Sequence, residues 1–220
     1  MDAKMRGNIV TGLMVLCLVL GLWGQFGNSW LTEESEDVDT GGEMEIDVSL
    51  SESRMKSDAM TEEECEDTAD LYDDADLKGF SCDGDALVLS LSGAHENCED
   101  ALGDDPTDAE ENGCDDLGAA ASAGFTGGLI LWFASVTALA CTVLLIINIV
   151  GVELDAVPDK VGMILMWTAG SLTIFAVFLW YTMLPDRLTD YETGINTWMT
   201  VVGGIFALVA GGMDTFMADE

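Results

Sequence analysis

The stretch WLTEESEDVDTGGEMEIDVSLSESRMKSDAMTEEECEDTADLYDDADLKGFSCDGDALVLSLSGAHENCEDALGDDPTDAEENGCDD, residues 30 to 116, decides the fold. It carries 31 of the 41 acidic residues of the chain, only three basic residues and four of the six cysteines. Uncharged apolar segments flank it on both sides. Cysteines at near-equal spacing in a short exposed segment are typical of oxidising compartments. We therefore expect an exposed, disulfide-bonded domain beside a membrane.

Four uncharged segments are long enough to cross that membrane, because a helix needs about 20 mostly apolar residues to cross the ~30 Å hydrocarbon layer. Four such segments in a soluble core would lack an amphipathic covering, so we disfavour that alternative. The sequence predicts a mainly α-helical membrane protein, a four-transmembrane-helix bundle with a small disulfide-stapled α+β extracytoplasmic domain between the first two helices. The four uncharged segments contain no Asp, Glu, Lys, Arg or His. They run from Gly7 to Thr32, Leu117 to Val152, Val161 to Pro185 and Thr193 to Met213.

The expected organisation follows from these boundaries and from the basic residues beside them. Lys4 and Arg6 precede the first segment and Lys160 lies in the second loop, whereas the third loop has only Arg187. Because basic residues resist export, this favours cytoplasmic termini in a multi-pass protein of the cell membrane. The expected parts are a cytoplasmic N-terminus (1–6), a first span (7–29), the acidic domain (30–118), a second span with an outward extension (119–151), a cytoplasmic loop (152–160), a third span (161–184), an outer loop (185–194), a fourth span (195–213) and a cytoplasmic tail (214–220).

Tryptophan placement agrees with this threading, because indole rings prefer the membrane interface. Five tryptophans and one tyrosine fall toward the outer interface and Trp167 is the exception; the six are Trp23, Trp30, Trp132, Trp180, Tyr181 and Trp198. The first span could alternatively be a cleavable signal peptide, since a basic start precedes the apolar run Ile9 to Leu22. The acidic domain is exported under either interpretation.

Four cysteines, Cys65, Cys82, Cys98 and Cys114, can staple the acidic domain with two disulfides, and the sequence leaves three pairings open. Each bridge typically contributes ~2 to 4 kcal/mol. A zinc site is a weaker alternative, because there is no C-x-x-C pair and His95 is the only histidine. The remaining cysteines, Cys17 and Cys141, lie inside spans as packing residues.

Local patterns predict two strands and one helix within the acidic domain. Alternation over Glu43 to Ser51 and over Ala86 to Ser92 indicates strands. Thr61 and Glu64 form a capping-box signature, and a helix is expected from there toward a stop at Lys78-Gly79. The segment 92–118 is expected to form loops with at most one or two helical turns.

The formal charge of −28 on residues 30 to 116 predicts weakly held cations, and no nucleic-acid partner, on this domain. Asp74, Asp76, Gly79 and Asp85 fall at EF-hand-like positions, but Lys78 occupies a ligand position and no glutamate closes the loop. We assign no metal site. A charged surface that is simply solvated is the favoured interpretation.

The spans lack the groups that proton relays, metal sites and intramembrane catalysis need. We expect no catalytic residue, cofactor or enzymatic activity. Asn148 is the one strongly polar side chain deep in a span, where it can bond across helices. The lipid bilayer is the expected partner, and small residues at intervals of four favour packing within the chain over a homo-oligomer or a protein partner; they are Gly203, Ala207 and Gly211 in the last span, and Gly124 and Gly128 in the second.

The layout of one span, a large disulfide-bonded outer loop and three further spans resembles the claudin-like tetraspan proteins. The resemblance covers the whole chain as a topology only. That family places Trp before Gly-Leu-Trp and two cysteines, whereas here Gly21-Leu22-Trp23 precedes Trp30 and four cysteines follow. We carry no functional residue over from it.

Three functions remain open at this point. The leading hypothesis is a non-enzymatic membrane protein that presents an acidic interaction domain for structural, adhesive or envelope contacts. The alternatives are an accessory subunit of a membrane transporter or enzyme complex, and a divalent-cation sensor.

Overall fold

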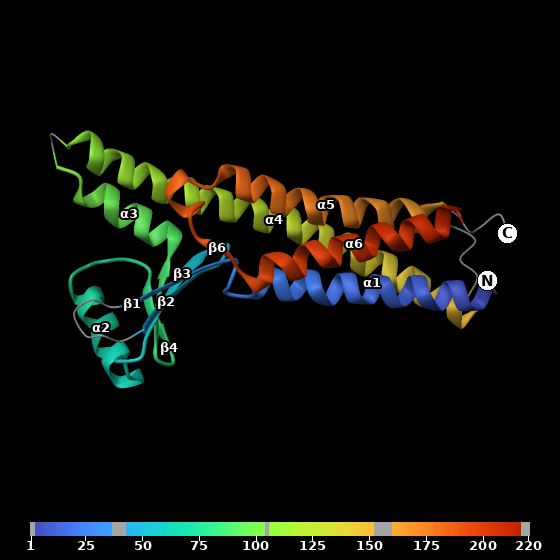
Figure 1. Cartoon of the computed structure of the whole chain (residues 1–220), viewed down its shortest axis with the longest axis horizontal. Helices are drawn as coiled ribbons and strands as arrows, with labels where there is room; N and C mark the ends of the chain where they lie inside the picture. The colour runs from blue at the N-terminus through green and yellow to red at the C-terminus, as the bar shows by residue number, and fades with distance from the viewer. Residues whose placement is uncertain (1–2, 37–42, 104–105, 152–159, 217–220) are drawn as a thin grey trace. The chain divides into compact units, whose positions relative to one another are not determined.

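The computed structural model describes residues 3–36, 43–103, 106–151 and 160–216, and these form two compact units (Figure 1). The helical unit comprises residues 1–26, 127–179 and 196–220, and the sheet unit comprises residues 27–126 and 180–195. The expected loop 152–160 and the end of the expected tail lie almost wholly outside the described residues.

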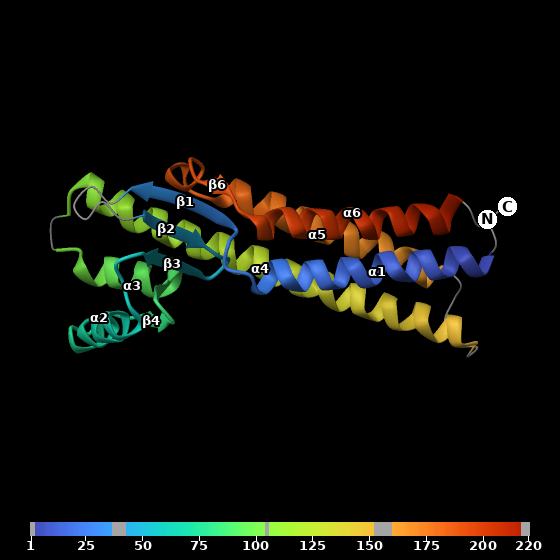
Figure 2. The same cartoon turned by 60° about the horizontal axis from the view of Figure 1, so that its bottom comes forward.

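Four long apolar helices supply the helical unit, as the sequence predicts. They are α1 (Ala3–Phe26), α4 (Asp108–Val150), α5 (Val161–Met183) and α6 (Ile195–Phe216), and each is long and apolar enough to span a membrane. Within this unit the helices lie side by side in both views (Figures 1 and 2). The first turn of α1 and the last turn of α6 are at the same end of the unit.

Small residues let α6 approach two neighbours at once. A Cβ on Gly203 would lie 3.2 Å from the Cys17 carbonyl of α1, and one on Gly211 would lie 3.1 Å from the Trp167 ring nitrogen of α5. Ala207, between them, is fully buried. The predicted stripe is therefore covered by helices of the same chain, with different partners along its length.

Polar side chains in these helices are satisfied locally. Six threonine hydroxyls donate to the carbonyl four residues earlier, which removes the cost of a bare donor in apolar surroundings. The six threonines are Thr11, Thr137, Thr142, Thr173, Thr200 and Thr215.

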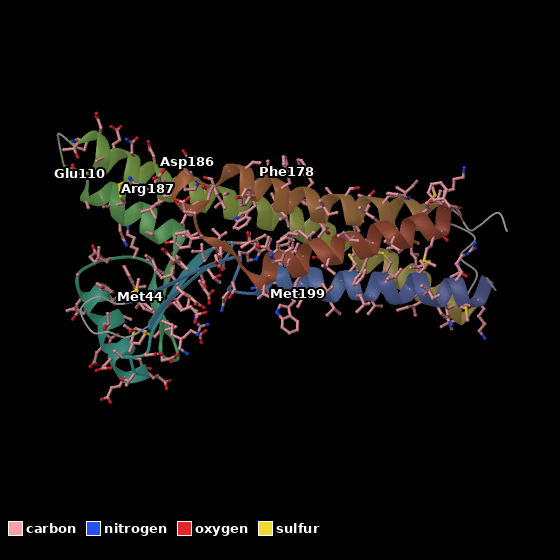
Figure 3. All side chains as sticks on the ribbon, in the orientation of Figure 1. Met44, Glu110, Phe178, Asp186, Arg187 and Met199 are labelled. Carbon is pink, nitrogen blue, oxygen red and sulfur yellow. A yellow bond between two sulfur atoms is a disulfide. The ribbon has the colours of Figure 1, made fainter. Side chains whose placement is uncertain are left out.

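Large apolar side chains cover the outside of the same helices; Phe178, on the outer side of α5 in Figure 3, is 63% exposed.

A six-stranded antiparallel sheet with the order β4-β5-β3-β2-β1-β6 forms the centre of the sheet unit. The last strand comes from the connection between α5 and α6, so both segments of the sheet unit, 27–126 and 180–195, contribute strands to one sheet. Its bounds are Leu31–Glu36 (β1), Glu43–Val48 (β2), Glu52–Ser57 (β3), Phe80–Asp83 (β4), Ala86–Ser90 (β5) and Glu192–Thr193 (β6).

Two disulfides fasten shorter helices to the sheet unit and settle the pairing that the sequence left open. Cys65–Cys82 joins α2 (Glu62–Asp74) to β4, and Cys98–Cys114 joins α3 (Leu91–Ala101) to α4. Each closes a loop of 16 or 17 residues. A crosslink over such a loop typically contributes about 3 kcal/mol by restricting the unfolded chain.

The two predicted strands and the predicted helix are confirmed, with shorter bounds. The first strand ends at Val48, and the second ends at Ser90, where α3 begins. The capping box at α2 forms as expected: the Thr61 amide donates to Glu64 Oε2 at 3.0 Å, and the Glu64 amide donates to Thr61 Oγ1 at 3.3 Å.

The prediction of loops over 92–118 was wrong. This segment contains α3 and the start of α4, and the glycines and acidic residues are tolerated because a disulfide and two caps fix the helices. Ser90 caps α3 through Gly93, and the Thr107 amide donates to Glu110 Oε2 at 2.8 Å at the start of α4. The helix α4 therefore begins at Asp108 rather than near Ala119.

Two of the six tryptophans are buried in the sheet unit. Trp30 and Trp180 are 0% and 1% exposed, and their rings meet edge to face at 4.7 Å. Such a pair is more favourable than two separate indoles in water. By contrast, Trp23, Trp132 and Trp198 of the helical unit are more than half exposed.

We predict that Gly124→Ala destabilises the protein by about 2 kcal/mol, the usual cost of overpacking. The added methyl would collide with the Leu50 carbonyl in the turn between β2 and β3. The control is Gly113→Ala on the same helix, where the space is open and the better helix former is neutral or slightly stabilising. Thermal unfolding in detergent compares the two; equal melting temperatures would contradict the close contact.

Candidate functional site: the charged face of the sheet

One face of the sheet carries nearly all of its charged side chains. The register pairs Asp47 with Arg54, Arg54 with Val88, and Glu45 with Lys56. Because side chains alternate along a strand, residues paired in register share a face. Glu34 joins this face through its pairing with Glu45. We call it the charged face.

The two basic residues of the charged face both reach toward the β4–β5 hairpin. Arg54 Nη1 lies 2.8 Å from Asp83 Oδ2, and its other terminal nitrogen donates to the Asp83 carbonyl at 3.0 Å. Lys56 Nζ lies 3.1 Å from Asp85 Oδ2, which lowers the pKa of the Asp85 carboxyl. Both cations therefore form ion pairs with acids of the hairpin at one edge of the sheet.

Glu34, Glu45 and Asp47, on β1 and β2, make up what we call the acidic strip. Glu34 and Glu45 are directly opposite each other, an arrangement that destabilises a strand pair unless a cation intervenes. Among the described residues no ion pair reaches these three carboxylates. Asp47 Oδ1 is also the only buried side-chain oxygen or nitrogen in the described part of the chain without a hydrogen-bond partner. The strip is the uncompensated part of the charged face.

A small polar hollow of about 220 Å³ lies on the charged face beside Arg54. Ser49, Glu52, Ser81 and Asp83 contribute its polar wall, and Val88 lines it as well. The hollow is lined by the acidic side chains of Glu52 and Asp83 and by the basic side chain of Arg54. The hollow suits a small polar group rather than an apolar ligand.

The third basic residue of the acidic domain stabilises a turn. Lys78 Nζ lies 2.6 Å from Glu96 Oε1, which raises the pKa of the lysine. Asn97 holds the backbone of Lys78 with two hydrogen bonds. Its Oδ1 accepts from the Lys78 amide at 2.8 Å, and its Nδ2 donates to the Lys78 carbonyl at 2.9 Å. The adjacent Gly79 has φ +84°, a conformation that glycine adopts without strain.

The residues at EF-hand-like positions do not form a cation site in the described part of the chain. Asp74 ends α2, Asp76 occupies the following turn with φ 60°, and Asp85 is committed to Lys56. Within residues 3–36, 43–103, 106–151 and 160–216, no three His, Cys, Asp or Glu side chains are placed to hold a metal.

The single histidine supports the junction of α3 and α4. His95 Nδ1 lies 3.1 Å from the Cys114 carbonyl, and its ring occupies the space where a Cβ on Gly118 would be. All four cysteines of this unit are in disulfides.

Gly124 lies in the same unit against Leu50, whereas Gly128 is half-buried further along α4.

The connection between α5 and α6 closes the open edge of β1. The Gly194 amide donates to the Trp30 carbonyl at 2.9 Å, and β6 pairs with Leu31 and Thr32. Arg187, labelled in Figure 3, lies 3.4 Å from Asp116 of α4. Burial and a hydrogen bond to Glu33 raise the pKa of Tyr191 to about 12.

No protein-family model matches the chain, and no curated protein matches it at a significant level.

Sequence patterns alone found the cysteines and one cap but missed the charged face. Single residues such as Glu34 or Arg54 have no local signature, because their relation depends on strand register. The cap at Thr107 could have been found, since Thr107-x-x-Glu110 repeats the pattern of Thr61-x-x-Glu64.

We predict that Glu33→Gln lowers the pKa of Tyr191 toward its ordinary value of 10, because a neutral amide no longer opposes the phenolate. Since the folded-state pKa is raised, the stabilisation from this contact is complete below pH 10 and is lost as the pH rises through about 12. Ultraviolet titration of wild type against Tyr191→Phe isolates the transition. Glu34→Gln, on the opposite face, is the control and leaves the titration unchanged; an equal shift would contradict the contact.

Proposed function

We propose that this chain is a non-enzymatic integral membrane protein whose sheet unit lies outside the cytoplasm and contacts a cationic partner through the acidic strip. The observation that carries the proposal is that Arg54 and Lys56 form their ion pairs with Asp83 and Asp85, so that the strip carboxylates, although two of them are opposite these cations in the register, have no ion pair in the described chain. A basic segment of another protein or of the cell envelope would supply that charge.

Insertion of the four helices is supported by their surface. Apolar side chains such as Phe133 and Phe178 are 61% and 63% exposed, which a water-soluble surface seldom tolerates at this density. Trp23, Trp132 and Trp198 share one level: Ser135 Oγ lies 3.4 Å from Gln25 Oε1, and a Cβ on Gly24 would overlap Thr200. An exposed indole layer is typical of a membrane interface.

Retention of the first helix, rather than its cleavage as a signal peptide, is part of the proposal. Val10, Met14 and Cys17 of α1 are at most 2% exposed and belong to the same core as Ala138 and Met166. Loss of α1 would expose that core. The resemblance to claudin-like proteins stays a hypothesis about layout and adds no site.

The accessory-subunit alternative receives less support from the small-residue stripes. Gly203 and Gly211 face α1 and α5 of the same chain, and Gly124 faces Leu50. A partner in the membrane would have to use other helix faces. The divalent-cation sensor would require the strip carboxylates to converge on one ion.

We predict opposite labelling of two introduced cysteines. In intact cells a membrane-impermeant maleimide should label Asp58→Cys, in the exposed turn before α2, but should label Lys160→Cys only after lysis. The unmodified protein is the background control, because its free Cys17 and Cys141 are buried. The reverse pattern would reject the proposed sidedness, and release of the protein by alkaline carbonate would reject insertion.

A second prediction tests the strip itself. Glu34→Gln, Glu45→Gln and Asp47→Asn combined should weaken binding of an oligolysine probe by about tenfold, since three exposed ion pairs contribute roughly 0.5 kcal/mol each. The measurement is fluorescence anisotropy with protein in nanodiscs at low and high salt.

The matched control for the strip removes the same three charges from the exposed side of α2, by Glu62→Gln, Glu66→Gln and Asp70→Asn. It should change the affinity by less than about twofold, because screening weakens distant charges. Equal losses would show that overall charge, and not the strip, attracts the probe. Calcium binding that persists at high salt and is lost in the strip variant would favour the sensor.

A further inference from the structure

A hollow of about 390 Å³ lies at the end of the helical unit where α1 begins and α4 and α6 end. Its volume is within the range of small-molecule sites. Three helices contribute polar side chains to its wall: Lys4, Arg6 and Asn8 from α1, Asn148 from α4, and Asp214 from α6. None of these residues belongs to the charged face.

Cationic and amide donors dominate the polar wall. The helical unit has three basic residues in its sequence, and two of them, Lys4 and Arg6, line the hollow. The positive end of the α1 helix dipole points to the same place, and the first turn of α1 contains no acidic residue. Ammonium, guanidinium and amide groups together suit the oxygens of a phosphate.

Apolar side chains complete the wall and lead away from it along the helices. Val10 and Leu145 line the hollow with Ile149, which is 48% exposed, and Ile146 one turn earlier on α4 is 46% exposed. A ligand with a charged head and an apolar chain can therefore satisfy both parts of the surface. Free phosphate would leave the apolar part uncovered.

Asp214 is the only acidic residue among the described residues that line the hollow. It is half-buried near the end of α6. A carboxylate here opposes a bare anion but accepts a hydrogen bond from a donor beside the phosphate. Headgroups that carry a hydroxyl or an ammonium next to the phosphate have such a donor, whereas choline has none.

We propose that this hollow binds the phosphodiester of a membrane phospholipid through Lys4 and Arg6, with Asp214 selecting headgroups that end in a hydrogen-bond donor. The inference rests on the proposed insertion in a membrane. It gives a role to Asn148, which lies near the end of α4, is exposed and lines the hollow.

The experiment is native mass spectrometry of the full chain in detergent with added lipid. Phosphatidylglycerol and phosphatidylethanolamine should be retained about tenfold better than phosphatidylcholine, and diacylglycerol should not be retained, since one charge-assisted contact is worth that factor. Lys4→Gln should reduce retention of phosphatidylglycerol about tenfold. Asp214→Leu should abolish the preference for phosphatidylethanolamine over phosphatidylcholine, which have the same net charge, without loss of phosphate binding.

Lys160→Gln is the matched control, because it removes a basic residue at the same end of the helical unit but outside the hollow. It should leave retention unchanged. Equal effects of Lys4→Gln and Lys160→Gln, equal retention of all the phospholipids, or complete displacement by inorganic phosphate would each overturn the proposal. If Lys4→Gln does not fold, the ranking of lipids on the unmodified protein decides. Carbonate extraction tests insertion independently, so a protein that resists extraction but shows no lipid preference fails this inference alone.

Discussion

Carboxylates and long apolar helices cannot share one solvent, and this constraint governs the chain. The four long apolar helices bury only part of their surface against one another, and each is long and apolar enough to span a membrane. The acidic segment between the first two needs water and counter-ions. The division into a helical unit and a sheet unit follows this segregation closely.

The sheet unit holds together despite its charge because specific contacts offset the repulsion locally. Two disulfides fasten α2 and α3, and each of Arg54, Lys56 and Lys78 is placed against acids. With only three cations for so many carboxylates, some acids must stay uncompensated. The distribution of the cations, and not the number of acids, therefore determines which part of the surface is available to a partner.

The helical unit depends instead on close packing of small residues and on hydrogen bonds within its helices. Glycine and alanine bring α6 close to α1 and α5, and six threonine hydroxyls donate to a carbonyl of their own helix. Charged side chains are confined to its end, where Lys4, Arg6 and Asp214 meet a hollow. The two units thus offer two different electrostatic surfaces, an acidic one on the sheet and a mixed one at the helix ends.

The sequence by itself determined the features that depend on neighbours along the chain: the four apolar helices, the cap at Thr61, the strand over Glu43–Val48 and the presence of disulfides. It misjudged α3 and the start of α4, since glycine and aspartate disfavour helices locally and only the Cys98–Cys114 crosslink and the caps reverse that preference. It did not reveal that Trp30 and Trp180 pack against each other. The cysteine pairing, the joining of β6 to β1 and the charged face were decided by tertiary structure alone, because each depends on residues far apart in the chain meeting in a particular strand register.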